Sequence, residues 1–142
     1  MREFLFRGQT RRKGQKVWMD GSPVDSNWVE GYGVCMGKGD FSVIYAGSPV
    51  EKFPVYTDTV GQFTGLTDKN GKKVFEHDIL QTFTGGIGIV QWWEHDQCYV
   101  LATKEGYHID DFGNLGRPEY YEVIGNIYDN PELLGGADNA IQ

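Results

Sequence analysis

Glycine and proline interrupt this chain so often that only short strands fit between them. Between residues 24 and 60 the interruptions are Gly31, Gly33, Gly37, Gly39, Gly47, Pro49 and Pro54. Glycine occupies 20 of the 142 positions, about twice its average usage of roughly 7%, and 14% of the residues are aromatic. Glycine destabilises helix interiors and suits tight turns, whereas Tyr, Trp and Phe favour pleated surfaces. The composition predicts a mainly β fold with several short antiparallel sheets.

The strand pattern is clearest from residue 61 onward. Asn70-Gly71 follows the strand candidate 62–66 and predicts a hairpin in which both residues take the positive φ of a type I′ turn. Apolar runs separated by turn signals predict further strands at 77–83, 87–93, 98–103 and 120–124. Short strands at this near-regular spacing are typical of a small meander that closes into a barrel.

The N-terminal half gives a weaker pattern. We expect strands at 41–45 and 53–57, the second at a sheet edge because Pro54 has no N–H to donate to a ladder. The stretch 24–60 would then carry its own small sheet. Phe4 and Phe6 share one strand face and the run 17–19 is also apolar, which predicts a β-hairpin with a basic tip.

The length bounds the domain organisation. A chain of 142 residues can bury a core without disulfides or metals, so a single domain over 1–134 is predicted. It would divide into an N-terminal β region at 1–60 and a barrel region at 61–134. Asn130-Pro131-Glu132 predicts one helical turn with Asn130 as its N-cap, and residues 135–142 are expected to form a frayed tail.

Hydropathy and cysteine usage favour a cytoplasmic protein. No window approaches the ~20 apolar residues of a membrane helix, and Met1-Arg2-Glu3 opens into charges in place of an apolar signal core. Cys35 and Cys98 have no CxxC partner. We expect two reduced, packed thiols, with a single disulfide as the alternative.

The net charge of −7 conceals an uneven distribution. Residues 1–16 contain six basic side chains and one acidic one, so this head carries +5 and the remainder −12. A pI near 4.8 disfavours nucleic-acid binding through phosphate neutralisation. The basic head weakens that exclusion.

Two basic turns and a tryptophan pair supply the binding candidates. These candidates are Arg11, Arg12, Lys13, Lys69, Lys72, Lys73, Trp92 and Trp93. Each basic turn is either a solvated loop or a contact site for an acidic partner. Trp92 and Trp93 lie on opposite faces of one strand, so one is expected in the core. The other is either a subunit contact or part of a groove for a peptide or nucleotide.

Three histidines with acidic neighbours are the candidates for chemistry. If a barrel brought His77, His95 and His108 together, they would hold Zn²⁺ with a water, as in a hydrolase. The alternative is three surface histidines, because strand alternation places each one opposite its flanking acids. The sequence has no Gly-x-Ser-x-Gly, Gly-x-x-x-x-Gly-Lys-[Ser/Thr] or His-Glu-x-x-His motif, so we expect neither enzymatic activity nor a cofactor.

Three runs carry a resemblance to a known family. The run QFTGLTDKNGKKVFEHDIL at 62–80 is similar to Q-[YF]-T-G-L-x-D-K-N-G-K-x-[IV]-[YF]-E-G-D-[IV]. The run YEVIGNIYDNPELL at 121–134 is similar to E-[VI]-I-G-N-[IV]-Y-E-N-P-E-L-L, and REFLFR at 2–7 is similar to R-x-[IL]-x-F-R. By these runs the chain resembles the YopX family of phage and prophage proteins. His77 stands where that family has Gly, so a positive φ at this position would strain the backbone.

The resemblance implies a β-rich fold with an SH3-like small barrel in the later half, and it implies no particular activity. The leading hypothesis is a non-enzymatic phage or prophage accessory protein that recognises a protein partner or assembles with itself. One alternative is nucleic-acid binding, or mimicry of DNA by the acidic body to block a host enzyme. A metal-dependent hydrolase is the other alternative. No membrane partner is expected.

Overall fold

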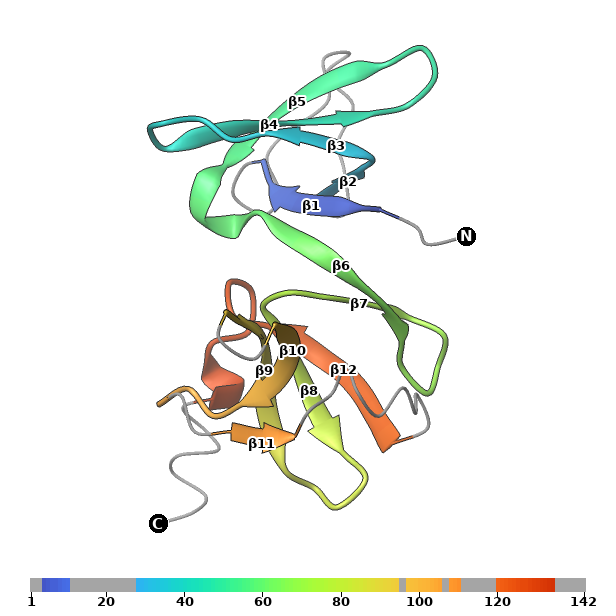
Figure 1. Cartoon of the computed structure of the whole chain (residues 1–142), viewed down its shortest axis with the longest axis vertical. Helices are drawn as coiled ribbons and strands as arrows, with labels where there is room; N and C mark the ends of the chain where they lie inside the picture. Colours follow the sequence, from blue (N-terminus) through green and yellow to red (C-terminus); the bar gives the residue numbers. More distant parts are fainter. Residues whose placement is uncertain (1–3, 11–27, 95–96, 106–107, 111–119, 135–142) are drawn as a thin grey trace. The chain divides into compact units, whose positions relative to one another are not determined.

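The computed structural model describes residues 4–10, 28–94, 97–105, 108–110 and 120–134. The chain forms two compact units, residues 1–63 and residues 64–142. Both are built from short antiparallel strands (Figure 1). Within the described ranges, the chain forms no helix with the length and apolar character that a membrane crossing requires. The predicted tail at 135–142 lies outside the described residues.

The first unit contains two small groups of paired strands. β1 pairs with β2 along its length and, at Phe6 and Arg7, with the start of β6. β3, β4 and β5 form a three-stranded sheet in that order. The elements are β1 (Phe6–Gln9), β2 (Trp28–Gly31), β3 (Gly33–Cys35), β4 (Phe41–Ala46), β5 (Glu51–Tyr56), the 3-10 turn η1 (Thr57–Thr59) and the start of β6 (Gly61–Thr67).

A small apolar cluster stabilises the first unit. Its buried members are Val29, Ile44, Phe53 and Val55. Glycine at position 8 allows close packing, because a Cβ there would lie 2.8 Å from two carbons of the Val55 side chain. Each fully buried side chain of this size contributes roughly 1.5–3 kcal/mol. The first unit therefore has a core of its own.

The second unit is a curled five-stranded sheet that forms half of a barrel, with strand order β11-β10-β9-β8-β12 (Figure 1). Strand β7 pairs with β6, whose end belongs to the second unit. Its buried core comprises Val74, Leu80, Val90, Tyr99, Leu101 and Tyr121. The strands are β7 (Lys73–Phe75), β8 (Asp78–Thr82), β9 (Ile87–Trp93), β10 (Cys98–Ala102), β11 (His108–Asp110) and β12 (Tyr121–Asn126).

The expected fold class is confirmed, including the curled sheet in the later half and the helical turn near the C-terminus. Helical residues occur at 132–134, immediately after Pro131. The Asn130 carbonyl oxygen accepts the Leu133 N–H at 3.1 Å, so Asn130 precedes the helical turn as expected. Its Oδ1 accepts a hydrogen bond from the Asn126 N–H at 3.2 Å.

The run 17–19, the predicted hairpin partner of the first strand, lies outside the described residues, and the described partners of β1 are β2 and β6. The predicted type I′ turn is wrong. In the turn between β6 and β7, Gly71 has φ 82° but Asn70 keeps a negative φ, so the turn is not type I′. The Asp68 side chain closes this turn instead, as described below.

The two cysteines are free thiols. Cys98 is half-buried, but Cys35 is exposed, so the expectation that both are packed is wrong for Cys35.

Candidate functional site

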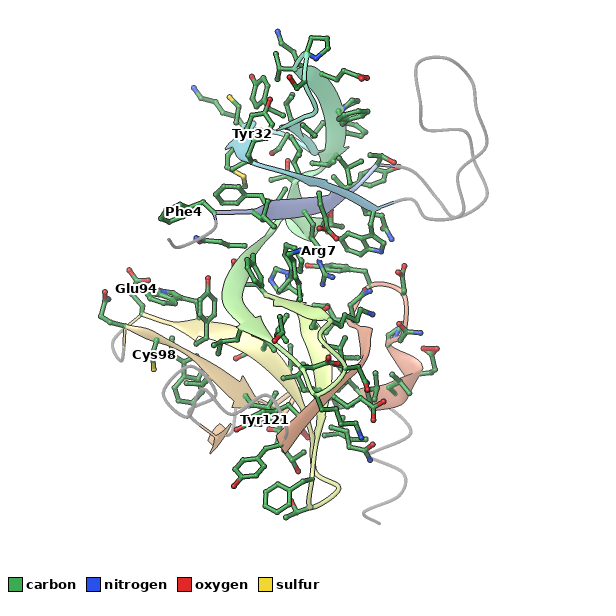
Figure 2. All side chains as sticks on the ribbon, turned by 90° about the vertical axis from the view of Figure 1, so that its right-hand side faces the viewer. Phe4, Arg7, Tyr32, Glu94, Cys98 and Tyr121 are labelled. Atoms are coloured by element: carbon green, nitrogen blue, oxygen red, sulfur yellow. The ribbon has the colours of Figure 1, made fainter. Side chains whose placement is uncertain are left out.

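An open groove of about 300 Å³ lies in the second unit, where the hairpin between β8 and β9 approaches the beginning of β12. Tyr121, which Figure 2 labels, is only 1% exposed and belongs to both the core and the groove lining. The other lining residues include Lys69, Gln81, Thr82, Phe83, Tyr120 and Glu122. The groove therefore combines aromatic, hydroxyl, amide and charged groups.

An aromatic pair, exposed Phe83 and half-buried Tyr120, forms one wall of the groove. Phe83 is 72% exposed, and its ring lies 4.8 Å from the Tyr120 ring at an interplanar angle of 32°. The Phe83 N–H donates to the Tyr120 carbonyl oxygen at 2.9 Å, which extends the pairing of Thr82 with Tyr121 by one residue. The sheet itself therefore positions a large apolar surface in solvent.

The hairpin turn that carries Phe83 is held by its own hydrogen bonds. Thr82 N–H donates to the Gly86 carbonyl oxygen at 2.8 Å, and Gly85 N–H donates to the Thr82 carbonyl oxygen at 2.9 Å. Gly85 has φ 96°, a conformation that glycine adopts without steric cost. The Gly85-Gly86 segment is thus a hairpin turn, and it fixes the residues next to Phe83.

A charged pair forms a rim of the groove. Lys69 Nζ lies 3.4 Å from Glu122 Oε1, and about half of each side chain is exposed. The Lys69 N–H also donates to the Tyr121 carbonyl oxygen at 3.0 Å, so the backbone fixes the base of this side chain. An exposed ion pair of this kind contributes little to stability. Both groups can exchange their partner for a charged group on a ligand.

Asp68 holds the turn that presents Lys69. Its Oδ1 accepts the N–H groups of Asn70 and Lys72, and its Oδ2 accepts the Val123 N–H, each at 2.9 Å. The residue is 3% exposed. Burial raises the pKa of this carboxyl. The three backbone hydrogen bonds and the Lys72 charge lower it by more, so the pKa of Asp68 lies below its usual value. Asp68 is therefore a charged clip between the turn and β12.

The predicted basic turns do not act as units in this site. Only Lys69 lines the groove, while Lys72 and Lys73 are exposed beside it and outside its lining. The first basic turn, Arg11 to Lys13, lies outside the described residues.

The two tryptophans lie away from the groove. Trp92 is 41% exposed, its ring makes an edge contact with Tyr99 at 5.0 Å, and its Nε1–H donates to Glu94 at 3.2 Å. Trp93 is half-buried and donates to Gln91 at 3.1 Å. Figure 2 labels Glu94 and Cys98 at the facing ends of β9 and β10, which carry this cluster.

The sequence interpretation missed Phe83 as a site residue. The available signal was an aromatic side chain directly before a Thr-Gly-Gly turn, a position where strand alternation no longer places a side chain in the core.

The structure places one of the three candidate histidines in detail. The His77 ring makes an edge contact with Tyr128, at a centroid distance of 5.6 Å. His95 lies outside the described residues, and His108 is described only as part of β11. In the part of the chain that the structure describes, no three His, Cys, Asp or Glu side chains are grouped as metal ligands would be.

The comparisons with known proteins identify the family. The model of the family described as YopX protein matches residues 25–135. The chain belongs to the YopX family. No curated protein matches it. Among solved structures, protein EF1440 from Enterococcus faecalis is similar at 21% identity and a TM-score of 0.44, over 94% of this chain and 99% of that one.

The first YopX signature run serves local structure. His77, at the position of the family's glycine, has φ 75°. Its N–H donates to the Val90 carbonyl oxygen at 2.9 Å, and its carbonyl oxygen accepts the Ile127 N–H at 3.1 Å. Next to it, Asp78 Oδ2 accepts the Phe75 N–H at 2.8 Å. The turn between β7 and β8 therefore requires a left-handed residue, and here a histidine occupies that position.

The second YopX signature run is also built on backbone hydrogen bonds. Asn126 Oδ1 accepts the N–H groups of Tyr128 at 3.0 Å and Asp129 at 2.9 Å. A Cβ at Gly125 would lie 2.5 Å from Asn130 Oδ1, so only glycine fits without a shift. Gly125 and Asn126 therefore hold a turn, whereas Lys69 of the first run and Tyr121 and Glu122 of the second line the groove.

Proposed function

We propose that the protein is a non-enzymatic recognition module, and that the groove of its second unit binds an extended segment of a partner protein. The observation that carries the proposal is that the Phe83 and Tyr120 pair, with Phe83 largely exposed, lines the same groove as the Lys69 and Glu122 pair. We further propose, from the family resemblance, that it acts as a phage or prophage accessory protein in the host cytoplasm.

The aromatic wall supports an apolar anchor. Aromatic side chains dominate binding energetics because they bury a large area at little conformational cost. A ring that is 72% exposed, as that of Phe83 is, loses contact with water when a partner side chain covers it. Extended peptides dock into aromatic-lined grooves by this means.

The charged rim supports orientation of the bound segment. Lys69 and Glu122 present opposite charges on one side of the groove, so a bound segment can pair with either group. Such rim charges set register and direction more than affinity. The proposal therefore assigns affinity to the aromatic wall and orientation to the rim.

The support beneath the groove favours preorganised binding. Residues on both sides are fixed by backbone hydrogen bonds, between Phe83 and Tyr120 and between Lys69 and Tyr121. A groove that is already ordered costs less entropy when it binds. The lower entropy cost compensates for the limited contact area that a small, open groove offers.

Selection of peptides from a randomised display library against the full chain tests the proposal. We expect enriched peptides with an apolar residue and a Kd on the order of 10–100 µM, as in transient interactions. Phe83→Ala should weaken their binding by about tenfold or more, and Lys69→Ala by about two- to threefold.

Trp92→Ala is the matched control, because Trp92 is an exposed aromatic residue of the same unit that does not line the groove. Its affinity for the selected peptides should equal that of the unaltered chain. Failure to enrich any peptide, or equal binding by Phe83→Ala and the unaltered chain, would contradict the proposal.

A further inference from the structure

We propose that the first unit carries a separate site for an arginine side chain of a partner protein. The site is an open groove of about 330 Å³ formed by the turn before β4 and by the end of β5 with η1. Its lining residues are Gly39, Asp40, Phe41, Tyr56, Thr57 and Asp58. All of them belong to the first unit, so the inference does not depend on the groove proposed above.

An aromatic platform, Phe41 with Tyr56, lies in the groove lining. Phe41 and Tyr56 are directly paired in the β4–β5 ladder, and their rings lie 5.1 Å apart at an interplanar angle of 32°. Phe41 is 53% exposed, and Tyr56 is half-buried. The face of an exposed aromatic ring attracts a cation through the ring quadrupole. The platform can therefore bind a flat cationic group.

Two carboxylates determine the charge of the ligand. Asp40 directly precedes Phe41, Asp58 follows Tyr56 by two residues, and both are exposed in the groove lining. Lys38, the basic residue of the same turn, does not line the groove. Two acids beside an aromatic platform favour a cation and disfavour a phosphate or carboxylate ligand.

A hydroxyl network holds the groove in shape. Thr57 Oγ1 donates to the Gly39 carbonyl oxygen at 3.0 Å and lies 2.9 Å from Ser42 Oγ. Ser42 Oγ accepts the Gly37 N–H at 2.9 Å, and Thr57 N–H donates to the Asp40 carbonyl oxygen at 2.8 Å. The two walls are thus bonded to each other before any ligand arrives, which lowers the entropy cost of binding.

Arginine fits this combination better than lysine. A guanidinium is planar, so it can stack on the Phe41 ring while its N–H groups donate to Asp40 or Asp58. An ammonium group is more strongly hydrated and has no flat face to stack. The two carboxylates and the aromatic platform therefore both favour an arginine side chain.

Amide chemical-shift titration of the ¹⁵N-labelled full chain tests the inference. The probes are the peptide Ac-Gly-Ser-Arg-Ser-Gly-NH₂ and the same peptide with citrulline, its uncharged isostere. We expect saturable shifts at Asp40, Phe41 and Thr57 with the arginine peptide, with a Kd on the order of 1 mM. The citrulline peptide should bind about fivefold more weakly or worse.

Variants locate the site. Phe41→Ala, and separately Asp40→Asn with Asp58→Asn, should each weaken arginine binding by about fivefold or more. Tyr32→Ala is the matched control, because Tyr32 is also 53% exposed in the same unit and does not line the groove. It should not change the affinity. The aspartate changes alter exposed side chains, so they test the site even if Phe41→Ala disturbs folding.

Several results would overturn the inference. They are equal binding of the citrulline peptide, equal binding of a third peptide with lysine in place of arginine, and shifts that lie elsewhere in the chain. Self-association that Asp40→Asn with Asp58→Asn abolishes would also overturn it, because the ligand would then belong to a second copy of the chain.

Discussion

The two units present aromatic pairs of similar geometry in grooves of different charge. Phe41 with Tyr56 and Phe83 with Tyr120 are both tilted by 32°, with ring centres 5.1 and 4.8 Å apart. The first pair shares its groove with two carboxylates, whereas the second shares its groove with an ion pair. Under the two proposals, the aromatic pair supplies contact area in each groove and the neighbouring charges select the ligand.

The supports beneath the two grooves also differ. Hydroxyls and backbone groups hold the first groove, through Ser42 and Thr57. A buried carboxylate, Asp68, holds the turn beside the second. We therefore expect loss of charge at this support to affect the second unit and to leave the first unchanged.

The largest expected effect on stability comes from core substitutions, which test whether each unit unfolds independently of the other. Ile44→Ala in the first unit and Leu80→Ala in the second should each lower the free energy of unfolding by about 2–5 kcal/mol, because both side chains are fully buried. Hydrogen exchange should accelerate mainly in the unit that carries the change. Equal acceleration in both units would show that the two cores unfold together.

Removal of the Asp68 carboxylate should have the next largest effect. Asp68→Ala leaves three backbone N–H groups without their acceptor, and we expect a loss of about 2–3 kcal/mol in urea unfolding. Asp40→Ala removes an exposed carboxylate from the first unit and serves as the control, with a change within about 0.5 kcal/mol. A loss in Asp68→Ala no larger than in this control would refute the role of Asp68 as a clip.

The pH dependence of stability should separate the two supports further. The pKa of Asp68 is lowered in the folded chain, so its contribution is complete above the ordinary carboxyl pKa of 3.8 and is lost as the pH falls through the folded value. Unfolding of the unaltered chain and of Asp68→Asn, compared from pH 7 to pH 3, should show a stability difference that shrinks with acid. A constant difference would contradict this assignment.

The smallest expected effect concerns the left-handed residue His77. His77→Gly and His77→Ala both remove the ring contact with Tyr128, so the difference between them isolates the backbone. The glycine variant should be more stable by about 1 kcal/mol, because φ 75° is unfavourable for alanine. Equal thermal unfolding of the two variants would indicate that the backbone relaxes at this position.

The strands between residues 77 and 103 were predictable because their signals are local. Alternating apolar runs and the Gly85-Gly86 turn define β8, β9 and β10 without reference to the rest of the chain. The pairing of β1 was not predictable in this way, because its partners β2 and β6 come from distant parts of the sequence. The prediction of the turn at Asn70 failed for a different reason. The Asp68 side chain closes this turn by accepting the N–H groups of Asn70 and Lys72.

Residues of the candidate site were also predictable only where their signal is local. Lys69 was visible as a basic residue in a turn. Phe83 becomes part of the groove wall through its pairing with Tyr120, which lies far along the chain. Residues that act through long-range pairing carry little signal in a single sequence.

We expect the clip between Asp68 and β12 to hinder unwanted strand addition to the sheet as well. One edge of β12 pairs with β8, and groups at the other edge are occupied by the Lys69 N–H and the Asp68 carboxylate. An unoccupied strand edge is a template for intermolecular pairing and amyloid-like growth. Asp68→Ala should therefore form fibrils that bind thioflavin T sooner than Leu80→Ala does at the same residual stability.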